Sequence, residues 1–87
     1  MKKAYPASQT HTTVLRYAPD RDKSLPQMGL DTWKNLSGTI VYFYLANGDG
    51  YWFRLLCVEG KTLVGYALVN DWWYFTTLPE KWVLRFY

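Results

Sequence analysis

The side chains best suited to nucleophilic or acid–base chemistry are few in this chain. It contains one cysteine, Cys57, and one histidine, His11. A reactive thiol needs a histidine or another cationic neighbour that lowers its pKa, but His11 lies in a threonine-rich segment and Cys57 lies in the apolar run 51–58. A free cysteine in such a run usually packs as a small hydrophobic side chain. We therefore expect no catalytic pair of this type.

The acidic residues offer one further arrangement. Asp49, Glu59, Asp71 and Glu80 all fall in segments that the sequence predicts to be turns. Asp49 and Asp71 follow strands of the same predicted direction, so their carboxylates would lie at one end of a sheet. Aspartates in turns usually accept backbone hydrogen bonds, and one histidine with one cysteine falls short of a standard zinc ligand set. The sequence favours a non-enzymatic protein with no cofactor and no metal site.

These turns separate apolar segments that resemble β-strands. Strands are predicted over residues 12–18, 39–46, 51–58, 62–69, 72–77 and 82–87. The connections after residue 39 are too short for parallel crossovers, so the strands form an antiparallel meander. One or two helical turns, capped by Asp31, are predicted over residues 30–36. The predicted fold class is all-β: a small antiparallel β-barrel, SH3-like or OB-like, of five to six strands with at most one short helix.

Length, composition and charge define one domain. The chain has 87 residues, of which 49% are hydrophobic and 20% aromatic, and it has no apolar run long enough to span a membrane as a helix. Residues 1–24 carry five basic and two acidic side chains, whereas residues 25–87 carry five of each. We predict a flexible N-terminal arm over residues 1–11 and a single domain over residues 12–87. With one cysteine and no membrane segment, we expect a cytoplasmic protein.

Alternation along the predicted strands assigns side chains to faces. The residues assigned to the core are Tyr51, Phe53, Leu55, Cys57, Trp73, Phe75, Trp82, Leu84 and Phe86. Trp72 and Tyr74 are assigned to the surface. Trp52, Leu56 and Val58 share the outer face of segment 51–58. A single barrel covers only its inside, so this outer face requires another cover: the segment around residue 33, a second subunit or a ligand.

Two short segments resemble a known family. Residues 70–74, Asn-Asp-Trp-Trp-Tyr, resemble the acidic loop and Trp-Trp strand of SH3 domains, and residues 78–81, Leu-Pro-Glu-Lys, resemble their 3₁₀ corner. In that family the first of the two tryptophans, here Trp72, lines a groove for proline-rich peptides. The chain lacks the family's distal hairpin, its Gly-aromatic-x-Pro-x-Asn-Tyr motif and its Ala-Leu-Tyr-Asp-Tyr opening. The resemblance implies a small-barrel shape and does not extend to peptide recognition.

The first of three classes of function is a small binding or assembly module. It would form a homodimer or bind a partner protein through an apolar, aromatic outer sheet face. The predicted contact residues are Trp52, Leu56, Val58, Trp72 and Tyr74. This class accounts for the apolar strands, the neutral domain and the scarcity of catalytic groups.

The alternatives are a nucleic-acid-binding protein and a ligand-binding protein. Aromatic side chains could stack on the bases of a single strand while a basic arm contacts phosphates. The candidates for stacking are Tyr44, Trp52, Tyr66 and Trp72, and those of the arm are Lys2, Lys3 and Arg16. A neutral domain disfavours this alternative. The second alternative is a small-ligand or enzyme site formed between subunits, where aromatic rings would stack on a planar ligand.

Overall fold

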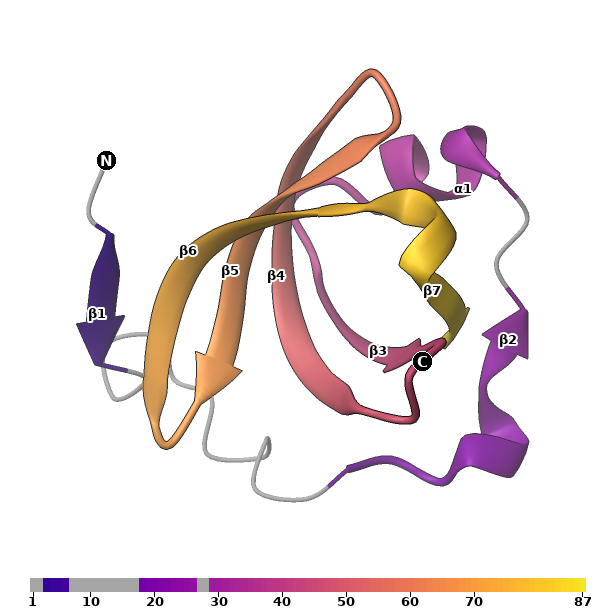
Figure 1. Ribbon diagram of the computed structural model, residues 1–87, viewed down its shortest axis with the longest axis horizontal. Coiled ribbons are helices and arrows are strands. Elements are labelled where there is room, and N and C mark those ends of the chain that lie inside the picture. The colour runs from indigo at the N-terminus through magenta and orange to yellow at the C-terminus, as the bar shows by residue number, and fades with distance from the viewer. Residues whose placement is uncertain (1–2, 7–17, 27–28) are drawn as a thin grey trace.

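The computed structural model describes residues 3–6, 18–26 and 29–87 (Figure 1). Its strands are β1 (Ala4–Pro6), β2 (Leu25–Pro26), β3 (Ile40–Leu45), β4 (Gly50–Glu59), β5 (Thr62–Val69), β6 (Trp72–Pro79) and β7 (Val83–Phe86). The α-helix α1 (Leu30–Asn35) and the 3₁₀ helices η2 (Arg21–Lys23) and η3 (Glu80–Trp82) connect them. The prediction of an all-β, mostly antiparallel fold with one short α-helix is confirmed.

All strands belong to one sheet, in the order β1-β6-β5-β4-β3-β7-β2. Every pairing is antiparallel, and β3 to β6 form four strands of the predicted meander. The fifth predicted strand, β7, pairs with β3 instead of continuing the meander beside β6. Among the described residues the sheet is open, because β1 pairs with β6 at one edge and β2 pairs with β7 at the other. The expected closure into an SH3-like or OB-like barrel is not confirmed.

The N-terminal region differs from the expected arrangement. Of the predicted strand 12–18, only Ala18 lies within the described residues, and it is not in a strand. The predicted arm 1–11 contains β1, whose Tyr5 lies opposite Trp73 of β6. Phe75 N donates a hydrogen bond to Lys3 O at 2.7 Å, which extends this pairing by one residue.

The inner face of the sheet carries the main core. Its buried side chains are Trp33, Val41, Phe43, Phe53, Leu55, Leu63, Ala67, Leu78, Val83 and Phe86. α1 covers part of this face, and the Trp33 ring lies 5.4 Å from that of Phe43 and 5.2 Å from that of Phe86. The helix begins after Gly29, whose φ is 100°, and no side chain caps it, so the prediction that Asp31 is the cap is wrong.

Two irregular positions change the faces that simple alternation predicts. A shift in register between Tyr44 and Leu45 makes Leu45 the partner of Val83. Val83 and Phe86 are therefore buried, whereas Trp82, which belongs to η3, and Leu84 are exposed, so their assignment to the core is wrong. An extra residue in one strand of a ladder reorients the side chains beyond it.

The second irregularity lies in β4, between Leu55 and Cys57. Beyond it, Val58 lies opposite Leu63 and packs against the core, so its assignment to the outer face is wrong. Cys57 lies opposite Val64 and is absent from the core cluster, contrary to its predicted place. Leu56 is the extra residue at this bulge and is half-buried.

Candidate functional site

The five predicted contact residues do not form one surface. Trp52 lies opposite Tyr42 on the outer face of the sheet and is half-buried. Leu56 and Val58 lie at and beyond the β4 bulge, where Val58 joins the core. Trp72 and Tyr74 are exposed, as predicted, and they share the inner face of β6. The structure therefore leaves these last two as the exposed members of the set.

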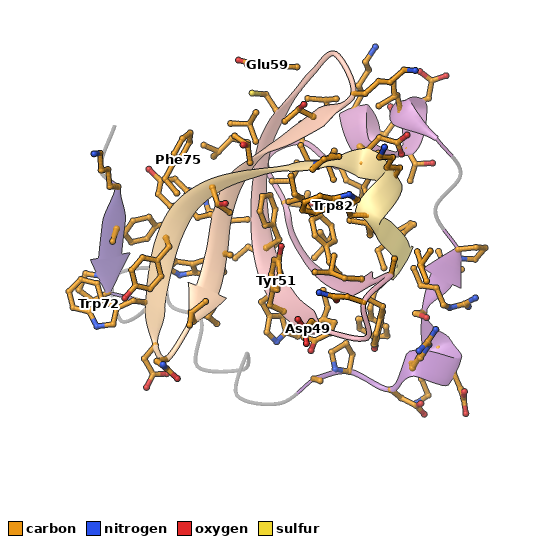
Figure 2. All side chains as sticks on the ribbon, in the orientation of Figure 1. Asp49, Tyr51, Glu59, Trp72, Phe75 and Trp82 are labelled. Carbon is orange, nitrogen blue, oxygen red and sulfur yellow. The ribbon has the colours of Figure 1, made fainter. Side chains whose placement is uncertain are left out.

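Trp72 and Tyr74 form an apolar patch with Val69, which alternation did not single out. The exposed fractions are 46% for Val69, 44% for Trp72 and 45% for Tyr74. Val69 lies directly opposite Trp72 in the β5–β6 ladder, and Tyr74 lies opposite the core residue Ala67. We call these three residues the Trp72 patch. It continues the inner face beyond the part that α1 covers, and Figure 2 shows Trp72 at the left edge of the molecule.

The turn between β5 and β6 holds this patch in place. Asn70 has φ 50° and Asp71 has φ 68°, which are the left-handed angles of a two-residue type I′ hairpin turn. The turn keeps the ladder in register as far as the pair formed by Val69 and Trp72. The patch thus stands on backbone that is hydrogen-bonded on the β5 side, next to one exposed carboxylate, that of Asp71.

The outer face of β3 and β4 carries a second group of aromatic rings. The Tyr42 ring lies 5.0 Å from that of Tyr44 and 5.2 Å from that of Trp52. Tyr44 Oη donates to Pro19 O at 2.7 Å, and the Arg21 guanidinium lies 5.8 Å from the Tyr44 ring. Burial raises the pKa of both Tyr42 and Tyr44 above the usual value of a tyrosine. These rings are half-buried and already have partners.

The remaining outer-face rings are packed around β1. The Tyr5 ring lies 4.9 Å from that of Tyr66 and 6.5 Å from that of Trp73, and Arg54 Nη1 donates to Tyr5 Oη at 2.9 Å. Tyr66 and Trp73 are buried, so the prediction that Trp73 is a core residue is confirmed, although it lies on the face opposite the main cluster. Phe75, also assigned to the core, is exposed, and that assignment is wrong.

The four rings proposed for stacking on nucleic acid are dispersed. Tyr44 and Trp52 are half-buried on the outer face, Tyr66 is buried, and Trp72 is exposed on the inner face. They do not form a common platform. Of the proposed basic arm, Lys3 is exposed, whereas Lys2 and Arg16 lie outside the described residues.

Of the candidate acid pair, Asp49 has a local role. Asp49 and Asp71 occupy turns at the same end of the sheet, as expected (Figure 1). Asn47 Nδ2 donates to the Asp49 carboxylate at 3.1 Å, and Asp49 N donates to Asn47 Oδ1 at 2.9 Å, so Asp49 stabilises its own turn. Burial, with a smaller contribution from Asp49, raises the pKa of Tyr51.

Within residues 3–6, 18–26 and 29–87, no group of three or more His, Cys, Asp or Glu side chains could hold a metal ion.

Similarity to known proteins gives no indication of function. The chain matches no protein-family model, no curated protein and no solved structure. In the part of the chain that the structure describes, no helix is long and apolar enough to cross a membrane. The Trp72 patch is the candidate site that geometry and exposure define.

Proposed function

We propose that this chain is a small, non-enzymatic assembly module of the cytoplasm that binds a second copy of itself through the Trp72 patch. The observation that carries the proposal is the patch itself: three large apolar side chains, adjacent across two strands and each nearly half exposed. A contiguous exposed apolar patch is typical of protein interaction surfaces. Tryptophan and tyrosine are also the side chains that most often dominate the binding energy of an interface.

The backbone under the patch favours tight binding. β6 is paired with β5 along its whole length and with β1 along Trp72, Trp73 and Tyr74. Side chains on such a paired strand lose less conformational freedom on binding than side chains on a mobile loop. A rigid, aromatic surface thus retains more of the free energy of apolar burial as affinity.

The charges of the β5–β6 hairpin favour a protein partner over nucleic acid. Between Lys61 and Glu80 the only charged residue is Asp71, which directly precedes Trp72. Binding to nucleic acid depends on lysine and arginine near the phosphates. The side chains of the hairpin itself therefore lack this contribution, whereas contact with another apolar protein surface does not require it.

The test compares two exposed tryptophans. Trp72→Ala removes the centre of the patch, and Trp82→Ala removes a similarly exposed indole on η3, which Figure 2 shows apart from Trp72. Sedimentation equilibrium over a range of concentrations measures self-association. We expect the unmodified chain to associate, Trp72→Ala to weaken association about 30-fold, equivalent to about 2 kcal/mol, and Trp82→Ala to leave it unchanged.

Two results would contradict the proposal. One is an unmodified chain that stays monomeric at every accessible concentration. The other is an equal loss of association in Trp72→Ala and Trp82→Ala, since the Trp72 patch would then have no special part. Circular dichroism of both variants verifies that each one is folded when association is measured.

A further inference from the structure

The strand β1 lies on β6 as a short peptide would lie on the edge of a sheet (Figure 1). Its three residues run antiparallel to β6 in this register: Ala4 opposite Tyr74, Tyr5 opposite Trp73 and Pro6 opposite Trp72. β6 is also paired with β5 through all eight of its residues, Trp72–Pro79. Its place in the sheet therefore does not depend on which copy of the chain supplies β1.

Tyr5 is the side chain that anchors β1. Its ring lies 4.9 Å from that of Tyr66 on β5 and 6.5 Å from that of Trp73 on β6. Its hydroxyl accepts a hydrogen bond from Arg54 Nη1 on β4 at 2.9 Å. Three neighbouring strands thus form one seat for a tyrosine, and none of these contacts requires that the tyrosine belong to the same chain.

β1 borders the Trp72 patch. Residues directly opposite each other in a sheet share a face, so Pro6 lies on the inner face beside Trp72, and Ala4 lies there beside Tyr74. A contact between two copies through this patch brings the β1 strands and the β6 edges of both copies to one junction.

The connection that follows β1 is long enough to reach a second copy. Eleven residues, 7–17, separate β1 from Ala18. A chain of this length spans roughly 36 Å at full extension, whereas the longest dimension of the protein is 31 Å. β1 can therefore reach the β6 edge of an adjoining copy while the remaining strands keep their pairing.

We infer that two copies joined at the Trp72 patch exchange their N-terminal strands, so that residues 3–6 of each copy pair with β6 of the other. The partner's Tyr5 then occupies the seat formed by Tyr66, Trp73 and Arg54. Each copy gives and receives the same strand, which closes the assembly as a two-fold symmetric dimer. This inference rests on the proposed function, since the Trp72 patch is what brings the copies together.

The size of the Trp72 patch shows what the exchange contributes. Three side chains that are each nearly half exposed offer roughly 300 Å², whereas a stable interface buries about 800 Å² per partner. Exchange adds a tyrosine ring and a backbone ladder to what must break before the copies separate. Because these contacts replace identical ones within one chain, exchange slows dissociation more than it raises affinity, and burial of the Trp72 patch drives association.

Cysteines placed across the β1–β6 ladder test the exchange. Lys3 lies opposite Phe75, whose N donates to Lys3 O at 2.7 Å, and both side chains are exposed on the outer face, away from the Trp72 patch. Opposite residues in such a ladder have Cα atoms about 4.5 to 5.5 Å apart, which a disulfide can bridge. One chain carries Lys3→Cys and a second carries Phe75→Cys. Cys57→Ser in both removes the native thiol.

The two chains are mixed in urea, refolded together, oxidised gently and separated on a non-reducing gel. We expect a disulfide that joins positions 3 and 75 of different chains. The matched control replaces Phe75→Cys with Thr77→Cys, which is exposed on the same face of β6 but two residues beyond the partner of Lys3. Paired thiols have an effective concentration of about 1 mM, so at ~100 μM protein the yield with Phe75→Cys should exceed that of the control about tenfold.

Two further controls verify the geometry and the folding. A single chain that carries both Lys3→Cys and Phe75→Cys should close the disulfide within itself when it is diluted to the monomer. Failure to do so would contradict the β1–β6 register on which the inference depends. Circular dichroism verifies that each variant is folded. Ala4→Cys and Tyr74→Cys, which are also opposite each other, replace the pair if Phe75→Cys does not fold.

The outcomes separate this inference from the proposed function. If the unmodified chain associates but no disulfide joins positions 3 and 75 of different chains, the exchange is wrong and the proposed function stands. If Trp72→Ala, added to both chains, leaves the inter-chain disulfide at full yield, the exchange stands and the proposed function is wrong. An unmodified chain that stays monomeric at every accessible concentration overturns both.

Discussion

Trp72 and Trp73 are neighbours in sequence with opposite environments. Trp73 is completely buried, near the Tyr5 ring and on the outer face, whereas Trp72 is exposed on the inner face. The same residue type therefore performs two separable tasks on one strand: Trp73 stabilises the domain, and Trp72 presents an apolar surface. The comparison shows that exposure and packing, more than residue type, identify the candidate contact residue. Substitutions can test the two tasks independently.

The largest effect is expected for Trp73→Ala. Removal of a fully buried indole leaves a cavity and costs about 3 to 5 kcal/mol. For a domain of this size, that loss lowers the melting temperature by more than about 12 °C or unfolds the chain. Thermal denaturation followed by circular dichroism measures it. A melting temperature close to that of the unmodified chain would show that Trp73 is not a stabilising residue.

Gly65→Ala is expected to have the next largest effect. Gly65 lies on the inner face opposite Leu55, and a Cβ added there would overlap Arg54 O and lie 2.6 Å from Phe53 Cε1. Because backbone cannot move away as a flexible side chain can, overpacking should cost about 1 to 3 kcal/mol. Chemical denaturation measures the loss. Ala67→Gly, at a buried position two residues along β5, serves as a control that removes volume instead of adding it.

Tyr5→Phe should have a smaller effect on the Trp73 side of β6. It keeps the aromatic ring near Tyr66 and Trp73 and removes only the hydroxyl that accepts from Arg54 Nη1. Loss of one hydrogen bond from a half-buried guanidinium should cost about 1 kcal/mol. Urea denaturation of Tyr5→Phe beside Tyr5→Ala separates the hydroxyl from the ring. Equal losses in both variants would assign the whole effect to the hydrogen bond.

The smallest change in stability is expected for Trp72→Ala. An exposed side chain away from caps and the core usually alters the free energy of unfolding by less than about 0.5 kcal/mol. Measured at a concentration where the chain is monomeric, its melting temperature should match that of the unmodified chain. A loss as large as that of Trp73→Ala would invert the assignment of the two tryptophans and remove the basis of the Trp72 patch.

Local sequence patterns predicted much of β6 correctly. Alternation from Trp72 to Tyr74 assigned one tryptophan to the interior and the other to the surface, since this strand is regular at its start. The same rule failed for Val58 and Leu84, because each lies beside an irregular position in the ladder. Such an irregularity depends on the partner strand, so the residues of one strand alone do not reveal it.

The residues of the candidate site also divide into those predicted from their own strand and those found only through pairing with another strand. Trp72 and Tyr74 were predicted from their own strand, whereas Val69 joined them through pairing with β5. Trp52 was predicted to be a contact residue because it is aromatic and on the outer face. Tyr42 packs against it, and that cross-strand contact half-buries a side chain that alternation alone leaves available.

What the sequence by itself determined is the all-β class, the positions of the four central strands and the locations of the turns between them. These features depend on alternation and turn residues, which act over a few neighbouring positions. Tertiary structure alone decided that β1 and β2 occupy opposite edges, that the sheet is open among the described residues, and that the Trp72 patch stays exposed. Those outcomes depend on pairings between segments far apart in the chain, such as Tyr5 with Trp73 and Leu25 with Phe86. Their energies come from contacts that exist only once the whole sheet has formed.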